Sequence, residues 1–337
     1  MGTRHVGNER VGHSRWLSCG LALLMGLAAH TAFAQGPQPY PNRPIYLIVP
    51  FAAGSGGDFL ARLVGSRLAT ILGQAVVVDN RPGAAGNLAM DVAAKAAPDG
   101  YTLVLGNAGT NTVNPSVYRK LPFDPILSFA PIARLTTVPS VIVAGSSSTV
   151  RTLTELVERA RAAPGTLDYA TVGVGLSSHL AMAAFSERAG IELMHIPYGT
   201  GGVLKAVLAG EVPMACTAVE VVRANIVKGG RLRALAVTSE RRIAALPDTP
   251  TVAELGYPGF NMESWYGVLA PSGTPQKIID RLNAELLRIV RDPEVARQIS
   301  DAGQVVAGSS PEELAADIRS GIERGRRLVE ALKIRVD

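Results

Sequence analysis

Four polar, glycine-rich loops are the segments of this 337-residue sequence that could bind a ligand. Each follows a run of apolar residues, and they occupy residues 52–58, 106–111, 173–179 and 197–202. Glycine lets a backbone approach a ligand closely, and the free N–H groups at a helix start favour an anion. One such loop could serve chain reversal alone, but four together favour a cleft. Because they hold few full charges, they favour a carboxylate bound by N–H groups and hydroxyls.

Catalytic and cofactor sites fit these loops less well. Phe59 stands where a dinucleotide-binding fingerprint needs glycine, and the first loop lacks the spacing of a nucleophile elbow. Ser177, Ser178 and His179 are adjacent and could form a hydrolase dyad, although neighbouring side chains on a helix point in different directions. His179 and His195 are far apart in the sequence, and no paired Cys/His spacing occurs. We therefore expect no catalytic residue, no metal and no cofactor.

Apolar runs between the loops predict a scaffold of alternating strands and helices. Residues 45–49 form a continuous apolar run, typical of a parallel strand buried on both faces. Further strands are expected at 75–79 and 102–106, with helices between them, and a second unit of this kind spans 140–238. A strand at 263–270, followed by C-terminal helices, then predicts a return to the first unit.

The predicted fold class is α/β, with two lobes that each contain an open α/β sheet. Two crossover strands join the lobes near Val138 and Glu263, and the ligand cleft lies between them, at the carboxyl ends of the strands. Trp265 and Tyr266 lie beside the second crossover, and we expect them to pack in the core or hinge rather than against a ligand. The expected lobes are 35–137 plus 264–337, and 138–263.

The N-terminus has the pattern of a cleaved export signal. Arginines precede an apolar run at 17–29, and Ala32, Phe33 and Ala34 place small residues at the positions that a signal peptidase reads. The run is shorter than the about 20 residues that a membrane span needs. We therefore expect residues 1–34 to be a signal peptide that is removed on export.

Composition narrows the class of protein further. After residue 34 a single cysteine remains, Cys216, so the exported fold must be held without an internal disulfide. The formal net charge is +5, but no dense run of Lys and Arg occurs. The charge therefore does not indicate nucleic-acid binding.

A series of segments along the mature chain resembles one known family. Near the start of the mature chain, residues 40–45 read Tyr-Pro-Asn-Arg-Pro-Ile and precede an apolar strand. Residues 50–58 then read Pro-Phe-Ala-Ala-Gly-Ser-Gly-Gly-Asp. In order, these segments resemble the substrate-binding proteins of tripartite tricarboxylate transporters, also called the Bug family. The matching segments are 40–45, 49–58, 79–87, 97–103, 121–125, 178–181, 195–198, 228–238 and 246–251.

This resemblance implies a periplasmic binding protein (type II) that captures a small organic acid and delivers it to a separate membrane permease. Family ligands include dicarboxylates, tricarboxylates, aromatic acids, amino acids and nicotinate-like compounds. The family commonly has an aspartate where Thr217 stands, so amino acids are less favoured, although Glu220 is close by.

The resemblance and the loops together define the expected site and its setting. We expect a periplasmic monomer without enzymatic activity, with an exported Ser/His hydrolase and a sensor subunit of a signalling system as the alternatives. The expected ligand-binding residues are Phe51, Ala53, Gly54, Ser55, Gly56, Asp58, Asn107, Gly109, Thr110, Asn111, Gly173, Ser177, Ser178, His179, Tyr198, Gly199 and Thr217.

Overall fold

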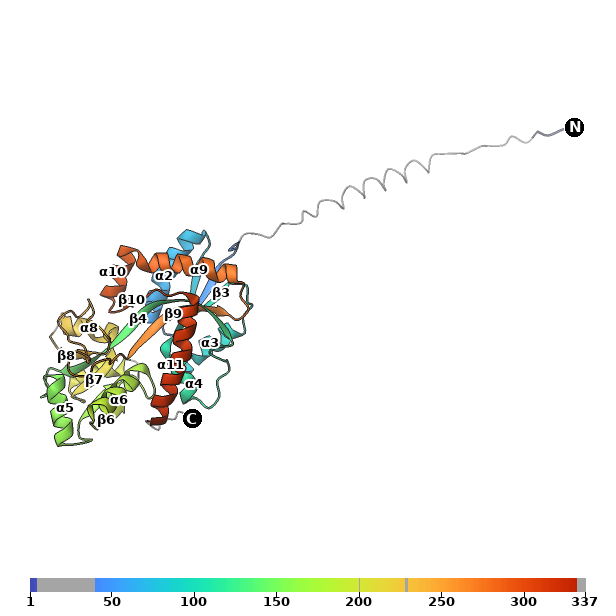
Figure 1. Ribbon diagram of the computed structural model, residues 1–337. Helices are drawn as coiled ribbons and strands as arrows, with labels where there is room; N and C mark the ends of the chain where they lie inside the picture. Colours follow the sequence, from blue (N-terminus) through green and yellow to red (C-terminus); the bar gives the residue numbers. More distant parts are fainter. Residues whose placement is uncertain (5–39, 200, 228–229, 332–337) are drawn as a thin grey trace. The chain divides into compact units, whose positions relative to one another are not determined.

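The computed structural model describes residues 1–4, 40–199, 201–227 and 230–331. The chain divides into a unit that ends at Asn42 and a compact unit that begins at Arg43. The helices and strands described below all belong to the second unit (Figure 1). Residues 5–34 of the expected signal peptide lie outside the described residues.

The described strands form one mixed sheet with the order β2-β1-β3-β9-β4-β7-β5-β6, and β8 and β10 also pair with β4. Strands β1, β2 and β3 are parallel, as are β5, β6 and β7, whereas β9 and β4 run antiparallel to their neighbours. The bounds are β1 (Ile45–Val49), β2 (Val76–Asn80), β3 (Thr102–Asn107), β4 (Phe129–Gly145), β5 (Asp168–Thr171), β6 (Met194–Pro197), β7 (Met214–Ala218), β8 (Leu232–Val237), β9 (Glu263–Pro271) and β10 (Val305–Val306).

Strand β4 joins the two halves of this sheet. It pairs with β9 through residues 129–139 and with β7 and β8 through residues 140–145. We call β1, β2, β3, β9 and β10 the first half and β5 to β8 the second half. The predicted α/β fold with two joined sheets is confirmed, and β4, which is 17 residues long, takes part in both, so the strands follow one continuous order. The division of the chain into lobes at residues 138 and 263 stays a prediction.

The first part of β4 was not expected as a strand, and its prolines explain why. A proline cannot donate to a sheet ladder, so a run that contains one is not read as a central strand. In the structure the register of β4 against β9 shifts between Pro131 and Ala133. At such an irregularity the regular ladder is interrupted, so the strand can accommodate a proline, which has no N–H to donate.

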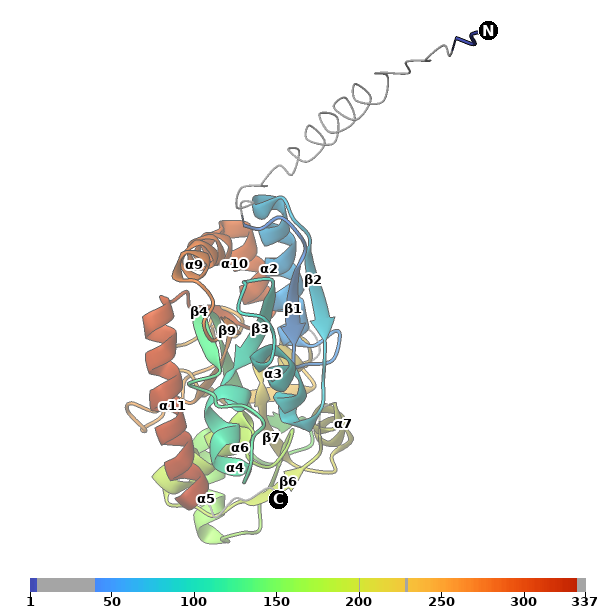
Figure 2. The ribbon, with the colours of Figure 1, turned by 90° about the vertical axis from the view of Figure 1, so that its right-hand side faces the viewer.

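Helices surround both halves of the sheet. Helix α9 packs against α2, α10 and β4, and α11 packs along β4 (Figures 1 and 2). Around the second half, α6 contacts β7, α7 contacts β5 and α8 contacts β8. The bounds are α2 (Gly56–Leu72), α3 (Asn87–Ala94), α4 (Asn114–Val117), α5 (Leu153–Ala162), α6 (Ser177–Ala189), α7 (Gly202–Ala209), α8 (Val219–Val227), α9 (Gln276–Arg291), α10 (Pro293–Asp301) and α11 (Pro311–Ala331), with short turns η1 (Ala84–Gly86) and η2 (Gly109–Val113).

Capping residues set where several of these helices begin. Thr152 Oγ1 accepts a hydrogen bond from the Glu155 N–H, so the predicted start of α5 is confirmed. Helix α2 begins three residues before the predicted residue 59, because Ser55 Oγ accepts from the Asp58 N–H and acts as the N-cap. The second loop is also not extended, since residues 109–113 form a π-helical turn.

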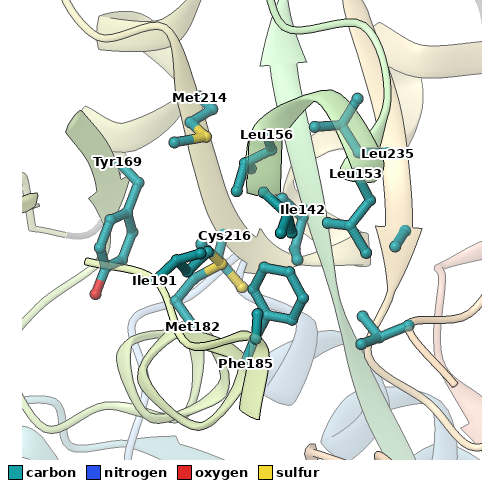
Figure 3. Close-up of a cluster of buried hydrophobic side chains, with 14 of the residues drawn as sticks. Ile142, Leu153, Leu156, Tyr169, Met182, Phe185, Ile191, Met214, Cys216 and Leu235 are labelled. Atoms are coloured by element: carbon teal, nitrogen blue, oxygen red, sulfur yellow. The ribbon is translucent and has the colours of Figure 1, made fainter. Parts of the chain in front are cut away.

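The second half of the sheet has its own hydrophobic core. Ile142 of β4 and Met214 of β7 pack against Leu156 of α5 and Phe185 of α6 (Figure 3). Cys216 lies fully buried in the same cluster, and its burial raises the pKa of the thiol to about 12. The one cysteine of the described chain is therefore an apolar core residue with little thiolate character.

Candidate functional site

A cavity of about 520 Å³ lies where the two halves of the sheet meet. Its walls come from the β1–α2 loop, the end of β3, β9 and the start of η2 on one side. The end of β7 and the starts of α6 and α8 form the other side, and β4 passes between them at Val138 and Ser140. Nine of the expected ligand-binding residues line it: Phe51, Gly54, Ser55, Gly56, Asn107, Gly109, Ser177, Ser178 and Thr217.

Eight expected residues do not line this cavity: Ala53, Asp58, Thr110, Asn111, Gly173, His179, Tyr198 and Gly199. Ala53 is exposed to solvent, as is Gly199 beyond the end of β6. Tyr198 packs on the core beside α7. Gly173 follows β5 and donates its N–H to Thr171 Oγ1 at 3.3 Å. The remaining four organise the loops from behind.

Asp58 is buried behind the β1–α2 loop and holds it in place. Its carboxylate accepts hydrogen bonds from the Gly54 N–H at 2.9 Å, Asn80 Nδ2 at 2.9 Å and Arg62 Nε at 3.0 Å. Asn80 also donates to the Phe51 carbonyl. Burial raises the pKa of Asp58, but these hydrogen bonds outweigh it and leave the pKa below its ordinary value. The carboxylate is therefore ionised and already fully engaged within the protein.

Thr110 and Asn111 play a similar role at the end of β3. Thr110 Oγ1 accepts from Asn107 Nδ2 at 3.1 Å, and the Thr110 N–H donates to Asn107 Oδ1. Asn111 Oδ1 accepts from the Asn107 N–H. Gly106 is needed here, because a Cβ would lie 2.2 Å from Leu269 Cδ1 and 2.7 Å from Asn111 Oδ1. The polar residues of this loop thus form a network around Asn107, in which the buried Asn111 Nδ2 has no partner among the described residues.

His179 and His195, which are far apart in the sequence, stack ring on ring. Their centroids lie 3.9 Å apart with an angle of 13° between the planes. His179 Nδ1 accepts from the Gly175 N–H at 3.0 Å, and His195 Nε2 lies 2.6 Å from Thr171 Oγ1. Burial, with a smaller contribution from His195, lowers the pKa of His179 to about 4. The neutral pair therefore holds the loop before α6.

Within the described residues, no hydrogen bond joins His179 to Ser178 as the hydrolase alternative would need. His179 Nδ1 is occupied by the Gly175 N–H, and Ser178 Oγ has no hydrogen-bond partner within the described residues. A serine nucleophile requires a base within hydrogen-bond reach. In the part of the chain that the structure describes, no three His, Cys, Asp or Glu side chains group in a way that could hold a metal ion.

Two hydroxyls in the cavity wall are buried without partners. Ser178 Oγ, in the first turn of α6, and Thr217 Oγ1, on β7, make no hydrogen bond to any described residue. An unpaired buried hydroxyl costs free energy unless something else satisfies it. Helix α6 also begins without a side-chain cap, so its first N–H groups face an uncapped end. These groups can bind an anion.

The strongest feature that sequence reasoning left out of the expected site is Glu220. It opens α8, directly after β7, and it lines the cavity together with Tyr266 of β9. The rule that selected the four loops, a polar segment at the carboxyl end of a strand, also applies to residues 217–220. Tyr266, expected to pack in the core or hinge, meets Phe51 edge to face and donates to Glu220 Oε1 at 3.2 Å. The other unexpected lining residues are Phe59, Val138, Ser140, Val172, Leu176, Ala218, Val221, Ser264 and Ala302.

Comparison with known proteins identifies the family to which the chain belongs. The model described as "Tripartite tricarboxylate transporter family receptor" matches residues 60–334. A relative from Pseudomonas sp. (strain P51), the UPF0065 protein in the tcbD-tcbE intergenic region, is 39% identical over 95% of this chain and 94% of its own length.

Two solved structures are similar over the whole of their own length. R. palustris Rpa4515 with adipate has a TM-score of 0.80 and 32% identity, and it covers 88% of this chain. The periplasmic binding protein BugD has a TM-score of 0.75 and 33% identity, again over 88% of this chain. These matches confirm both the resemblance to Bug proteins and the α/β fold of periplasmic binding proteins. The chain belongs to the family of tripartite tricarboxylate transporter receptors.

Proposed function

We propose that this protein binds a small organic acid in the cavity between the halves of the sheet and delivers it to a tripartite tricarboxylate-type membrane permease. The observation that carries the proposal is the pair of buried, unpartnered hydroxyls of Ser178 and Thr217 in the cavity wall. Both residues line the same cavity as the start of α2 and the turn after β3. A carboxylate would give both hydroxyls an acceptor.

The chemistry of the walls favours an acid over a sugar or a cation. Among the described residues the lining includes several hydroxyls and the start of α2 at Gly56, no Lys, Arg or His, and one carboxylate, that of Glu220. Neutral donors at helix starts bind anions without a full positive charge. The volume of about 520 Å³ lies in the usual range for small-molecule sites. Rpa4515, which is similar in fold, is described as bound to adipate.

Closure of the two halves over the ligand would provide the signal for delivery. Strand β4 runs through both halves and the chain returns to the first half at the start of β9, so bending near residues 138 and 263 would open or close the cavity. A ligand that contacts both walls favours the closed state by its difference in affinity. Within this proposal the lobes are residues 35–137 plus 264–337 and residues 138–263, and the whole chain acts as a monomer.

The proposed location is the periplasm, reached through a signal peptide at residues 1–34. BugD, a structural relative, is described as periplasmic. None of the helices within the described residues is long and apolar enough to cross a membrane.

Thermal unfolding in the presence of organic acids tests the proposed function directly. Adipate, malate and benzoate are added to the protein that begins at Gln35, with adipamide as the uncharged control. A ligand at 100 times its Kd should raise the free energy of unfolding by about 2.7 kcal/mol. We expect at least one acid, and not adipamide, to raise the Tm. Equal shifts with adipamide, or none with any acid, would contradict the proposal.

Removing the unpartnered hydroxyl of Thr217 should weaken ligand binding without lowering the stability of the ligand-free protein. We expect Thr217→Val to weaken the affinity for the acid about tenfold and to leave the ligand-free protein as stable or up to about 1 kcal/mol more stable, because the lost hydroxyl has no partner. Calorimetric titration and urea unfolding measure the two quantities. Ser178→Ala should behave in the same way.

Thr274→Val is the matched control for these variants. Thr274 is buried away from the cavity, and its Oγ1 donates to the Pro271 carbonyl at 2.8 Å. It should lower the stability by about 1 kcal/mol and leave the affinity unchanged. A loss of stability without a loss of affinity in Thr217→Val would remove Thr217 from the site.

A further inference from the structure

Among the described residues Glu220 is the one carboxylate that lines the cavity, and it reaches from the second half of the sheet to the first. Its Oε1 accepts from Tyr266 Oη at 3.2 Å, and its Oε2 accepts from Gln304 Nε2 at 3.0 Å. The same Gln304 amide donates to the Gly56 carbonyl, and Thr136 holds Gln304 Oε1. The carboxyl group is therefore placed by neutral donors from β9 and from the segment after α10, and Thr136 of β4 orients the second of these.

The carboxyl group of Glu220 also occupies the space beside the start of α2. A Cβ on Gly56 would lie 2.0 Å from Glu220 Oε2 and 2.4 Å from Oε1. Glycine at this position is what leaves room for the acid. Glu220 thus lies within the same small cavity that is proposed to hold the ligand carboxylate, at the helix start that favours an anion.

No cation compensates Glu220 within the described residues. On its own helix Arg223 lies 3.8 Å from Asp301 of α10, and on α2 the charge of Asp58 is matched by Arg62. The titratable group that faces Glu220 from β9 is Tyr266. Burial raises the pKa of Glu220 above its ordinary value, and the hydrogen bonds from Gln304 and Tyr266 only partly oppose it.

We propose that Glu220 takes up one proton when the organic acid binds, so that a neutral carboxyl group faces the ligand and sets its charge specificity. This inference rests on the proposed function. A second carboxylate in the same cavity disfavours the ionised form of the first, as for any like-charge pair. The proton comes from solvent, and the neutral acid can donate a hydrogen bond to the ligand oxygen. A ligand with an ammonium group would instead keep Glu220 ionised.

Proton counting by calorimetry tests this coupling in the wild-type protein. Adipate, or whichever of malate and benzoate gives the larger thermal shift, is titrated at pH 6 to 8 in phosphate and in Tris, which differ in ionisation enthalpy. We expect uptake that approaches one proton per ligand and a Kd that rises by up to roughly tenfold per pH unit. The Glu220→Gln protein should take up no proton, show a flat Kd across this range and bind the acid more tightly than wild type at pH 8.

Glu158→Gln is the matched control, since Glu158 is exposed on α5 and lies outside the cavity. It should retain the proton uptake of wild type. Binding of an acid by wild type with no proton uptake and a constant Kd would overturn the inference and leave the proposed function intact. Weaker binding by Glu220→Gln at every pH would also overturn it, because Glu220 would then act as an ionised acceptor. Failure of every acid to bind would overturn both.

Discussion

Replacing Asp58 by alanine is expected to lower the free energy of unfolding by about 2 to 3 kcal/mol. The change leaves Arg62 Nε, Asn80 Nδ2 and the Gly54 N–H without their shared acceptor. A buried donor that loses its partner costs about 1 to 3 kcal/mol, and Asp58 serves three of them. Part of this cost is recovered, because the guanidinium of Arg62 reaches solvent. Urea unfolding at pH 7 measures the loss.

The same substitution should weaken ligand binding although Asp58 does not line the cavity. The Asp58 carboxylate holds the Gly54 N–H, and Asn80 ties the Phe51 carbonyl, so the β1–α2 loop loses its anchor. Asp58→Asn keeps one acceptor oxygen and should have an intermediate effect on both quantities.

Asp79→Ala is the control for this effect. Asp79 lies beside Asn80 on β2, but its ion pair with Arg81 is largely exposed. Exposed pairs contribute about 0 to 1 kcal/mol, so this variant should remain close to wild type. If Asp58→Ala and Asp79→Ala lose the same stability, the buried network around Asp58 does not support the loop.

Acidification from pH 6.5 to 5 is expected to lower the free energy of unfolding by about 2 kcal/mol through His179 alone. The pKa of His179 is about 4 in the folded protein, below its ordinary value near 6.5. Between these values the unfolded chain binds a proton that the folded protein does not, so stability falls as the pH falls. The contribution is complete above pH 6.5 and lost at pH 4. Burial also lowers the pKa of His195, which adds a loss of the same sign.

The substitution His179→Gln isolates the contribution of His179 to the pH dependence of stability. The side-chain oxygen of the glutamine can still accept from the Gly175 N–H, but glutamine does not titrate. Urea unfolding of the protein that begins at Gln35 suits this test, because that protein has no histidine besides His179 and His195. We expect His179→Gln to lose about 2 kcal/mol less than wild type between pH 6.5 and 5. An identical pH dependence in the two proteins would show that His179 is not held in its neutral form.

Local patterns were sufficient for many of the individual elements and for about half of the expected site. The apolar run at residues 45–49 is β1, the Thr152–Glu155 pair opens α5, and the loop that begins at residue 52 ends in the N-cap Ser55. Each depends on contacts within a few residues of the chain. The nine expected residues that line the cavity lie at strand ends or helix starts, where such patterns are readable.

The roles of the other expected residues depend on strand register and on contacts between residues far apart in the sequence. Asp58, Thr110 and His179 have the residue types of ligand-binding groups, but their hydrogen bonds are made inside the protein. Nothing adjacent to His179 in the sequence reveals the ring of His195. The pairing of β5 with β6 fixes the position of His195, and α6 brings His179 against it.

The sequence alone determined the family resemblance, the alternation of strands and helices, and the polar glycine-rich loops at the strand ends. These properties are encoded in short windows, because helix and strand periodicities, caps and turns depend on neighbouring residues. Only the tertiary structure showed that the halves share one sheet through β4, and that Glu220 meets Gly56, Tyr266 and Gln304. Those contacts join residues far apart in the chain, and their existence depends on how the strands are paired.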